Sequence, residues 1–374
     1  MKLLLMIHSL QAGGAERVLT LIADGLASRG HKVYLLTLAG TEEDFFDSGK
    51  TVCRIGLNLA GQSKSALGAI WANLRRIRAI RGQLRAIKPD AVLSFTTSVN
   101  VLALLAAAGT PVPVIVSERV DPRAHVLQLR WRILRALAYR RAHALVVQTS
   151  SVVEWFRPRL PRRVPIDVIE NPISLHPDTH EPEVLVPRPY ILAAGRLSPQ
   201  KGFDTLIKAF AIAVGRCAPL SLAIAGSGPE AEALARLASQ RGLKGRVYFL
   251  GRVKALDALM RQAQAFVLSS RYEGFPNVLL EALACGVPVV SADCLSGPRE
   301  ILGDERYGIL VPPENPRALA EAIVRITSDP ALRERLSMAG LTRAAYYHPS
   351  VILGKWEQIL RAGGASRTEQ VFRT

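Results

Sequence analysis

Short apolar runs alternate with helical patterns along the first half of the chain. Between the first two runs, residues 15–28 repeat apolar positions at helical spacing, and Gly30 can end that helix. Runs without polar alternation are typical of parallel strands buried on both faces. The first half therefore predicts a Rossmann-like domain. The runs that predict its strands are 3–7, 32–38, 91–95, 112–117, 144–148 and 164–169.

A second series of the same kind follows a proline-rich stretch. Residues 171–189 hold five prolines and little periodicity, which indicates a linker. We expect one domain at 1–172, completed by a returning C-terminal helix at 350–374, and a second domain at 187–349. The predicted architecture is α/β, with two doubly wound Rossmann-like domains facing one another across a cleft and ligands at the carboxyl ends of the strands. The strands expected in the second domain are 190–194, 220–225, 247–250, 265–268, 287–291 and 308–311.

Composition narrows the class of protein. The chain has 374 residues, 49% of them hydrophobic and 21% charged, which suits two buried cores and excludes a mainly disordered or collagen-like chain. No uninterrupted apolar stretch is long enough to predict a membrane span. Residues 1–10 lack a small-residue cleavage site, so we interpret them as a first strand and not as a signal peptide. Four scattered cysteines predict neither a disulfide framework nor a zinc site, which favours a cytoplasmic protein.

Loops that follow strands of the second domain carry the candidate chemistry. The first holds Gly195 and Arg196 and reaches Lys201, and these two cations suit a diphosphate, although two plain surface cations explain them equally well. The second, which begins at Gly226, is a weaker signal because Gly-x-Gly turns often only connect a strand to a helix. In the first domain, Gly14 and its neighbour Gly13 can let a ligand approach the backbone closely.

A third loop, at residues 269–288, is more informative. Pro276 can begin a helix and Gly286 can end it. Free amides at the start of that helix are a natural seat for phosphate, and they belong to Asn277, Val278 and Leu279. A fourth loop, at 296–301, can close over the same cleft. Alternatively, its Gly and Pro only form an ordinary turn.

Two carboxylates accompany this phosphate seat. Glu281 lies within the predicted helix and Glu273 in the loop before it. Carboxylates close to a diphosphate are costly unless they accept hydrogen bonds from hydroxyl groups, which a ribose and a hexose supply. For Glu273 alone, a loop residue that caps the helix is the competing interpretation.

Positive charge is concentrated in the first domain. Of the net +17, residues 1–175 contribute 24 Lys and Arg against 12 Asp and Glu, or +12. One stripe of basic residues at helical spacing comprises Arg75, Arg78, Arg81, Arg85 and Lys88. A second segment holds Arg130 and Trp131 among leucines. Basic helices with Trp and Leu favour an anionic membrane surface, against a solvated helix face as the alternative. Nucleic acid is not expected, because no aromatic-interleaved basic motif is present.

Taken together, these motifs resemble the retaining glycosyltransferases of family 4, which have the GT-B fold. The resemblance spans nearly the whole chain. Any one motif is unspecific, but their order is distinctive. The motifs are Gly13-Gly14-Ala15-Glu16-Arg17, Asn171-Pro172-Ile173, Gly195-Arg196 with Lys201-Gly202, Gly226-Ser227-Gly228-Pro229, and the Glu-x7-Glu pair of Glu273 and Glu281.

The resemblance implies roles for these positions. Arg196 and Lys201 would bind the donor diphosphate, Glu281 the ribose hydroxyls, and Glu273 the donor sugar, with Glu273, Arg196 and Lys201 as the catalytic set. Gly14 would let the backbone approach the distal phosphate. Such enzymes need no metal or other cofactor, which fits the absence of an Asp-x-Asp pair. The remaining donor-binding positions implied are Gly195, Gly226, Arg252, Val253, Gly274, Phe275, Pro276, Asn277, Val278 and Leu279.

One departure from the family concerns the acceptor. Many members have a His after the strand expected at 112–116, where this chain has Glu118 and Arg119, and this resembles the branch that extends polyprenyl-diphosphate-linked glycans of bacterial surface polysaccharides. The resemblance implies a UDP-sugar donor, a lipid-linked glycan acceptor and attachment to the inner face of the plasma membrane. Alternatives are a soluble acceptor, a nucleotide-sugar epimerase of the same fold, or a non-catalytic basic binding module.

Overall fold

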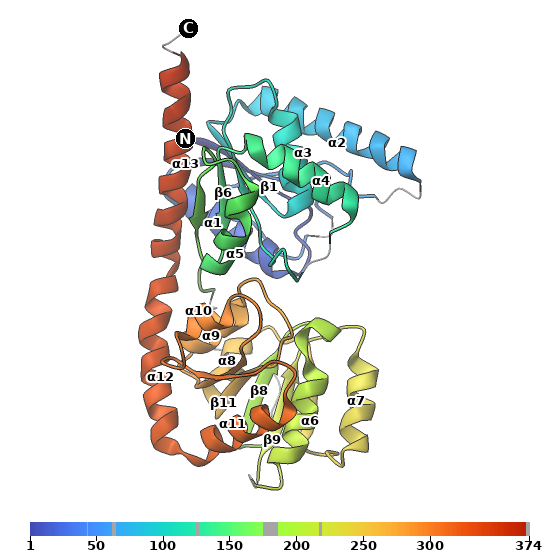
Figure 1. Cartoon of the computed structure of the whole chain (residues 1–374), viewed down its shortest axis with the longest axis vertical. Coiled ribbons are helices and arrows are strands. Elements are labelled where there is room, and N and C mark those ends of the chain that lie inside the picture. The colour runs from blue at the N-terminus through green and yellow to red at the C-terminus, as the bar shows by residue number, and fades with distance from the viewer. Residues whose placement is uncertain (43, 62–64, 125–126, 175–185, 217–218, 372–374) are drawn as a thin grey trace. The chain divides into compact units, whose positions relative to one another are not determined.

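The chain forms two compact α/β units. The computed structural model describes residues 1–42, 44–61, 65–124, 127–174, 186–216 and 219–371. Unit 1 comprises Met1–Pro172 with Pro349–Thr374, and unit 2 comprises Ile173–His348. Each contains one parallel sheet with helices on both faces (Figure 1). Most of the expected linker at 171–189 lies outside the described residues.

The sheet of unit 1 has the strand order β3-β2-β1-β4-β5-β6-β7, and all its pairings are parallel. The chain runs from β1 outward in one direction and from β4 in the other, so the strand order reverses between β1 and β4. The strands are β1 Lys2–Ile7, β2 Lys32–Thr37, β3 Cys53–Gly56, β4 Ala91–Phe95, β5 Val114–Ser117, β6 Ala144–Val147 and β7 Ile166–Val168. The helices are α1 Gly14–Ser28, α2 Ala66–Ile87, α3 Thr97–Ala107, α4 Leu129–Ala138, η1 Tyr139–Arg141, α5 Ser150–Phe156, η2 Arg157–Arg159 and α13 Pro349–Val371.

Apolar side chains cover both faces of this sheet. On one face α3 lies between α2 and α4 (Figure 1). The other face is covered by α1 and α13, and Trp356 of α13 is fully buried with its ring centroid 5.9 Å from that of Phe95. Complete burial of such a ring stabilises the fold by several kcal/mol, about 3–5 by the cost of truncating it to Ala. The last helix of the chain is therefore an integral part of unit 1.

The sheet of unit 2 has the order β10-β9-β8-β11-β12-β13, again with parallel pairings. Here the strand order reverses between β8 and β11. The strands are β8 Tyr190–Ala194, β9 Ser221–Ala225, β10 Val247–Gly251, β11 Ala265–Leu268, β12 Val289–Ala292 and β13 Ile309–Val311. The helices are η3 Pro199–Lys201, α6 Phe203–Ala213, α7 Ala231–Gln240, α8 Leu256–Gln262, α9 Asn277–Ala284, α10 Pro298–Leu302, α11 Pro316–Ser328, α12 Pro330–Ala344 and η4 Ala345–Tyr347.

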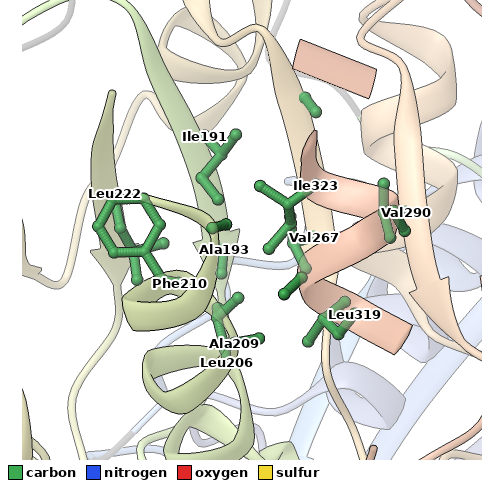
Figure 2. Close-up of a cluster of buried hydrophobic side chains, with 14 of the residues drawn as sticks. Ile191, Ala193, Leu206, Ala209, Phe210, Leu222, Val267, Val290, Leu319 and Ile323 are labelled. Atoms are coloured by element: carbon green, nitrogen blue, oxygen red, sulfur yellow. The ribbon is translucent and has the colours of Figure 1, made fainter. Parts of the chain in front are cut away.

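Figure 2 shows why the central strands of unit 2 are apolar throughout. Ile191 of β8 and Val267 of β11 point toward α6 and α11, where Phe210 and Ile323 fill the space. The opposite side chains of the same strands pack against α8, α9 and α10. Burial on both faces leaves no position for a polar residue, which confirms the continuous apolar runs as parallel strands.

Each expected strand is present, with its ends shifted by at most two residues. The strand β3 was missed, because it lies at the sheet edge and none of its residues is buried, so it has no apolar run.

Candidate functional site

The loops that follow β8 and β11 lie side by side, because these two strands are neighbours at the point where the strand order reverses. Lys201 ends the first loop and Glu273 lies in the second. The Nζ of Lys201 donates to Oε1 of Glu273 at 2.6 Å, although 72 residues separate them. Ser270 Oγ donates to the same oxygen at 2.6 Å. The fold thus brings together two of the predicted catalytic residues.

This ion pair is largely withdrawn from solvent. The side chain of Glu273 is 7% exposed and that of Lys201 is 19% exposed. A carboxylate at this depth remains charged at little cost only when it is paired and hydrogen-bonded, as this one is. Oε2 of Glu273 accepts no hydrogen bond from the described residues, so this oxygen can accept one from a hydroxyl group.

Arg271 fastens the two loops together. Its guanidinium donates to the carbonyl of Pro199 at 2.6 Å, to Asp204 at 3.0 Å and to Glu314 at 2.8 Å. The hydrogen bond to Asp204 raises the pKa of Arg271 above its ordinary value. Ser269 Oγ also donates to the carbonyl of Lys201, at 2.9 Å. These contacts hold the backbone of Lys201 against the loop that carries Glu273.

Backbone packing requires a glycine at position 226, in the second loop. A Cβ on Gly226 would lie 1.9 Å from the carbonyl oxygen of Gly195, and Gly226 has a φ of +143°. Its amide also donates to the carbonyl of Gly251 at 2.7 Å. The neighbouring Arg252 donates from Nε to Ser227 Oγ at 3.0 Å, so three loops at this edge are joined. Val253 packs partly buried against the apolar cluster that also holds the α9 side chains.

Helix α9 begins after Pro276, as expected, but its first turn differs from the prediction. The amide of Leu279 donates to the carbonyl of Pro276 at 3.0 Å, so it is not free for phosphate. The prediction of a free Leu279 amide was wrong, because the helix opens with a tighter turn than an ideal one. The amide of Val278 makes no hydrogen bond with the described residues.

The remaining predicted residues of this loop are well anchored. Glu281 lies inside α9 and is 6% exposed. Phe275 packs edge to face on Tyr347, with ring centroids 5.8 Å apart. The carbonyl oxygens of Glu273 and Gly274 both accept from Ser296 Oγ in the fourth loop, at 3.0 and 3.3 Å. Asn277 is the first residue of the helix.

Arg196 stands apart from this cluster. Its side chain is exposed, and its guanidinium makes no hydrogen bond or ion pair with the described residues. Its diphosphate role stays a prediction.

Apart from the basic segments, the predicted residues of unit 1 are Gly14, Glu118 and Arg119. Gly14 is the first residue of α1, after Gly13 with its extended backbone. Glu118 is buried just beyond β5, where it accepts from Tyr139 at 2.5 Å and from Thr97 at 2.9 Å. Burial raises the pKa of its carboxyl group. The contacts of Glu118 are those of a buried polar network.

Arg119 is also buried, with 7% of its surface exposed. It donates to Asn171 and to Ser117 and lies over the ring of Phe95 at 4.4 Å. It forms no ion pair with any described residue, and its Nε is a buried donor without a partner. Burial lowers its pKa to about 9.

The two basic segments are only partly as expected. On α2, Arg75, Arg78 and Arg85 are exposed, as is Lys88 at its end, but Arg81 caps α3 by donating to the carbonyls of Ala106 and Ala108 at 2.9 and 2.8 Å. On α4, Arg130 is exposed, whereas Trp131 packs against the core. Arg81 and Trp131 are thus only partly available at the surface, and their predicted acceptor or membrane role stays a prediction.

Sequence reasoning missed Ser270, Arg271 and Ser296 as residues that build the site. They lie within loops that the sequence marked, but the partners of Arg271 come from η3, from α6 and from the turn after β13. Only the strand order reveals these contacts.

Among the described residues, no group of three or more His, Cys, Asp or Glu side chains is arranged to hold a metal ion. None of the described helices has both the length and the apolar character that crossing a bilayer requires.

Comparison with known proteins gives consistent matches over most of the chain. A glycosyl transferase 4-like domain matches residues 13–172, and the glycosyl transferases group 1 domain matches residues 178–343. A Campylobacter jejuni protein is 28% identical over 362 residues, which are 96% of this chain and 98% of that protein. Its name is GalNAc-alpha-(1->4)-GalNAc-alpha-(1->3)-diNAcBac-PP-undecaprenol alpha-1,4-N-acetyl-D-galactosaminyltransferase.

Solved structures share the fold. Sucrose-phosphate synthase from Thermosynechococcus elongatus has a TM-score of 0.83 at 20% identity, over 98% of this chain and 99% of that one. Anabaena Alr3699/HepE in complex with UDP and glucose has a TM-score of 0.76 at 21% identity, over 97% of this chain and 100% of that one.

Proposed function

Since this chain belongs to the group 1 glycosyltransferases and has their GT-B fold, we propose that it transfers a hexose or an N-acetylhexosamine from a UDP-sugar to a polyprenyl-diphosphate-linked glycan, with retention at the anomeric carbon. The ion pair of Lys201 and Glu273 at the strand-order reversal carries the proposal. The name of the Campylobacter relative supports the acceptor class, and the HepE complex supports UDP.

In the proposed reaction the acceptor hydroxyl oxygen bonds to the anomeric carbon while the bond from that carbon to the diphosphate oxygen breaks on the same face. The hydroxyl proton passes to the departing oxygen. Negative charge therefore grows on the leaving UDP, and fixed cations close to it lower the barrier. Lys201 and Arg196 supply that charge, and Oε2 of Glu273 accepts a hydrogen bond from a donor-sugar hydroxyl.

No metal ion is required in this proposal, because Lys201 and Arg196 neutralise the diphosphate. This is tested by measuring the rate of sugar transfer in excess EDTA. The rate should match that without EDTA, and a full loss that added Mg²⁺ or Mn²⁺ restores would contradict metal-free transfer.

Two helices of unit 1 support attachment to an anionic membrane surface. Leu67, Ile70, Trp71 and Leu74 on α2 are between 38% and 73% exposed, and Leu129, Ile133 and Leu137 on α4 between 52% and 66%. Arginines flank both apolar stripes, and neither residues 48–89 nor residues 122–153 contain an Asp or Glu. Exposed apolar residues bordered only by positive charge suit the interface of an anionic bilayer. In the proposal this is the inner face of the plasma membrane.

Transfer is tested with nucleotide sugars first screened by thermal shift, since a donor that binds the folded state raises its melting temperature. The stabilising donor is then incubated with a polyprenyl-diphosphate glycan, and the product is weighed by mass spectrometry. We expect a gain of one sugar with the wild type and almost none with Lys201→Met. Transfer to soluble glycans alone would refute the lipid acceptor, and conversion of the sugar without any acceptor would indicate an epimerase.

Membrane attachment is tested by co-sedimentation with phosphatidylglycerol vesicles at low salt. Replacing Leu129, Ile133 and Leu137 by Ser should abolish binding, because these side chains are exposed and contribute little to the core. The matched control replaces Met338 and Leu341, which are 64% and 45% exposed in unit 2, and should bind as the wild type does. Absence of binding by the wild type would refute this part of the proposal.

A further inference from the structure

A cavity of about 690 Å³ lies at the amino edge of the unit 1 sheet, where β5 and β6 begin. Its walls come from the end of α3, residues 108–114, residues 140–143, Arg163, Pro165 and Gly363 of α13. This volume falls in the range of about 300–1,000 Å³ that is typical of small-molecule sites. The predicted residues Gly14 and Glu118 follow the carboxyl ends of β1 and β5, so the cavity lies at the opposite edge of the sheet.

Three arginines from two separate segments line this cavity. Arg140 and Arg141 come from η1, and Arg163 from the loop before β7. The two segments are joined, because the guanidinium of Arg163 donates to the carbonyl of Arg140 at 3.2 Å.

These three guanidinium groups have no acidic counterpart. All three arginines are exposed, none forms an ion pair with a described residue, and no Asp or Glu is among the residues that line the cavity. Like charges around one cavity repel one another, and a bound anion removes that cost.

The end of α3 would ordinarily oppose an anion here, since the carbonyl groups at a helix C-terminus carry partial negative charge. These carbonyls are already occupied. Arg81 donates to those of Leu105, Ala106 and Ala108, at 3.3, 2.9 and 2.8 Å. The amide and hydroxyl of Thr110 donate to that of Ala107, at 2.9 and 2.7 Å. The field inside the cavity is therefore dominated by the arginines.

We infer that this cavity binds the phosphate group of a phosphate ester, with Arg140, Arg141 and Arg163 donating to the phosphate oxygens. Guanidinium groups suit this task because their planar donors match phosphate geometry. Leu104, Val112 and Pro113 form an apolar wall for the organic part of the ligand. The phosphate comes either from a soluble ester or from the headgroup of an anionic lipid. The inference goes beyond the proposed transfer reaction and does not depend on it.

The test follows the ring resonances of His143, which lines the cavity, by NMR of the full chain with labelled histidine. The probes are glycerol 3-phosphate for a soluble ester and a short-chain phosphatidylglycerol for a lipid headgroup. The affinity is obtained by following the ligand-induced shift during a titration. The double variant Arg140→Gln, Arg163→Gln should lower this affinity at least about tenfold, because charge-assisted hydrogen bonds are lost. Lys201→Met, which removes a cation of the proposed diphosphate site in unit 2, should leave the His143 shift unchanged.

A matched control replaces Arg325 and Arg335, two exposed arginines of unit 2, by Gln and should also leave the shift unchanged. A shift with glycerol 3-phosphate supports the site and a soluble ligand, and a shift with phosphatidylglycerol alone supports the site and a lipid. No shift with either probe, or an equal shift in the Arg140→Gln, Arg163→Gln variant, overturns the inference. Sugar transfer by that variant is measured in parallel, so that failure of this site and failure of the transfer proposal are separated.

Discussion

Replacing Lys201 by Met tests the paired charges at the strand-order reversal. The Nζ to Oε1 distance is 2.6 Å, and the two side chains are 19% and 7% exposed. An exposed ion pair contributes about 0.2–1 kcal/mol to the free energy of unfolding, whereas removing one partner of a fully buried ion pair costs about 3–5 kcal/mol. The free energy of unfolding of unit 2 should therefore fall by about 1–3 kcal/mol, which lowers its Tm by about 2–10 °C.

Transfer should fall much more than stability does. Loss of one fixed group that stabilises transition-state charge costs about 10²–10³ in kcat. The assay is transfer at saturating donor, beside a thermal melt of each variant. Arg236→Met, which removes a cation from the exposed pair with Glu232 on α7, is the control and should transfer at the wild-type rate.

A double-mutant cycle with Glu273→Gln completes the test. Residues in direct contact show coupling energies of about 0.5–3 kcal/mol. The double variant should therefore lose less activity than the product of the two single losses. Additive losses, or a Lys201→Met enzyme with near wild-type kcat, would refute the reasoning.

Three further variants probe what holds the site and the fold together. Gly226→Ala should lower the free energy of unfolding of unit 2 by about 1–3 kcal/mol in a thermal melt, because its Cβ would meet a carbonyl oxygen at 1.9 Å. Gly245→Ala is the control and should cost less, because a Cβ there meets open space. Equal losses would show that backbone strain alone matters. Arg271→Met should lower kcat about tenfold or more with little change in donor KM, because it frees the loop that holds Lys201. An unchanged kcat would mean that the loop keeps its conformation without Arg271. Hydrogen bonds, of which the one from Arg361 has the largest effect, lower the pKa of Glu357 from 4.5 to about 2. This carboxylate therefore stabilises the fold above about pH 4.5, and that stabilisation is lost as the pH falls toward 2. Glu357→Gln should therefore melt below the wild type at neutral pH and approach it near pH 2, and a constant difference across this range would contradict the assigned contacts.

Much of the fold follows from the chain itself, because strands buried on both faces leave continuous apolar runs. The run at 265–268 is β11 with the same bounds. The strand β3 could not be predicted, since an edge strand without buried residues has no continuous apolar run. Loop glycines were also recognisable, although the reason for Gly226 is a neighbouring carbonyl and needs no ligand.

The candidate site was predictable in its residues but not in its contacts. Lys201 and Glu273 were both singled out, yet their direct pairing depends on β8 and β11 being neighbours. The helical stripe of α2 identified Arg81 as basic, but only the packing of α3 shows that it caps a helix. Periodicity reports which residues share a face, and it does not report what covers that face.

The most direct test of the proposed transfer is to follow the anomeric protons by NMR during a reaction with the stabilising UDP-sugar and a polyprenyl-diphosphate glycan. The account predicts that an α-configured donor yields one new α-linked sugar on the lipid-linked glycan, with UDP released in equal amount. A β-linked product would contradict retention, and a consumed donor with an unchanged glycan would contradict the transfer itself.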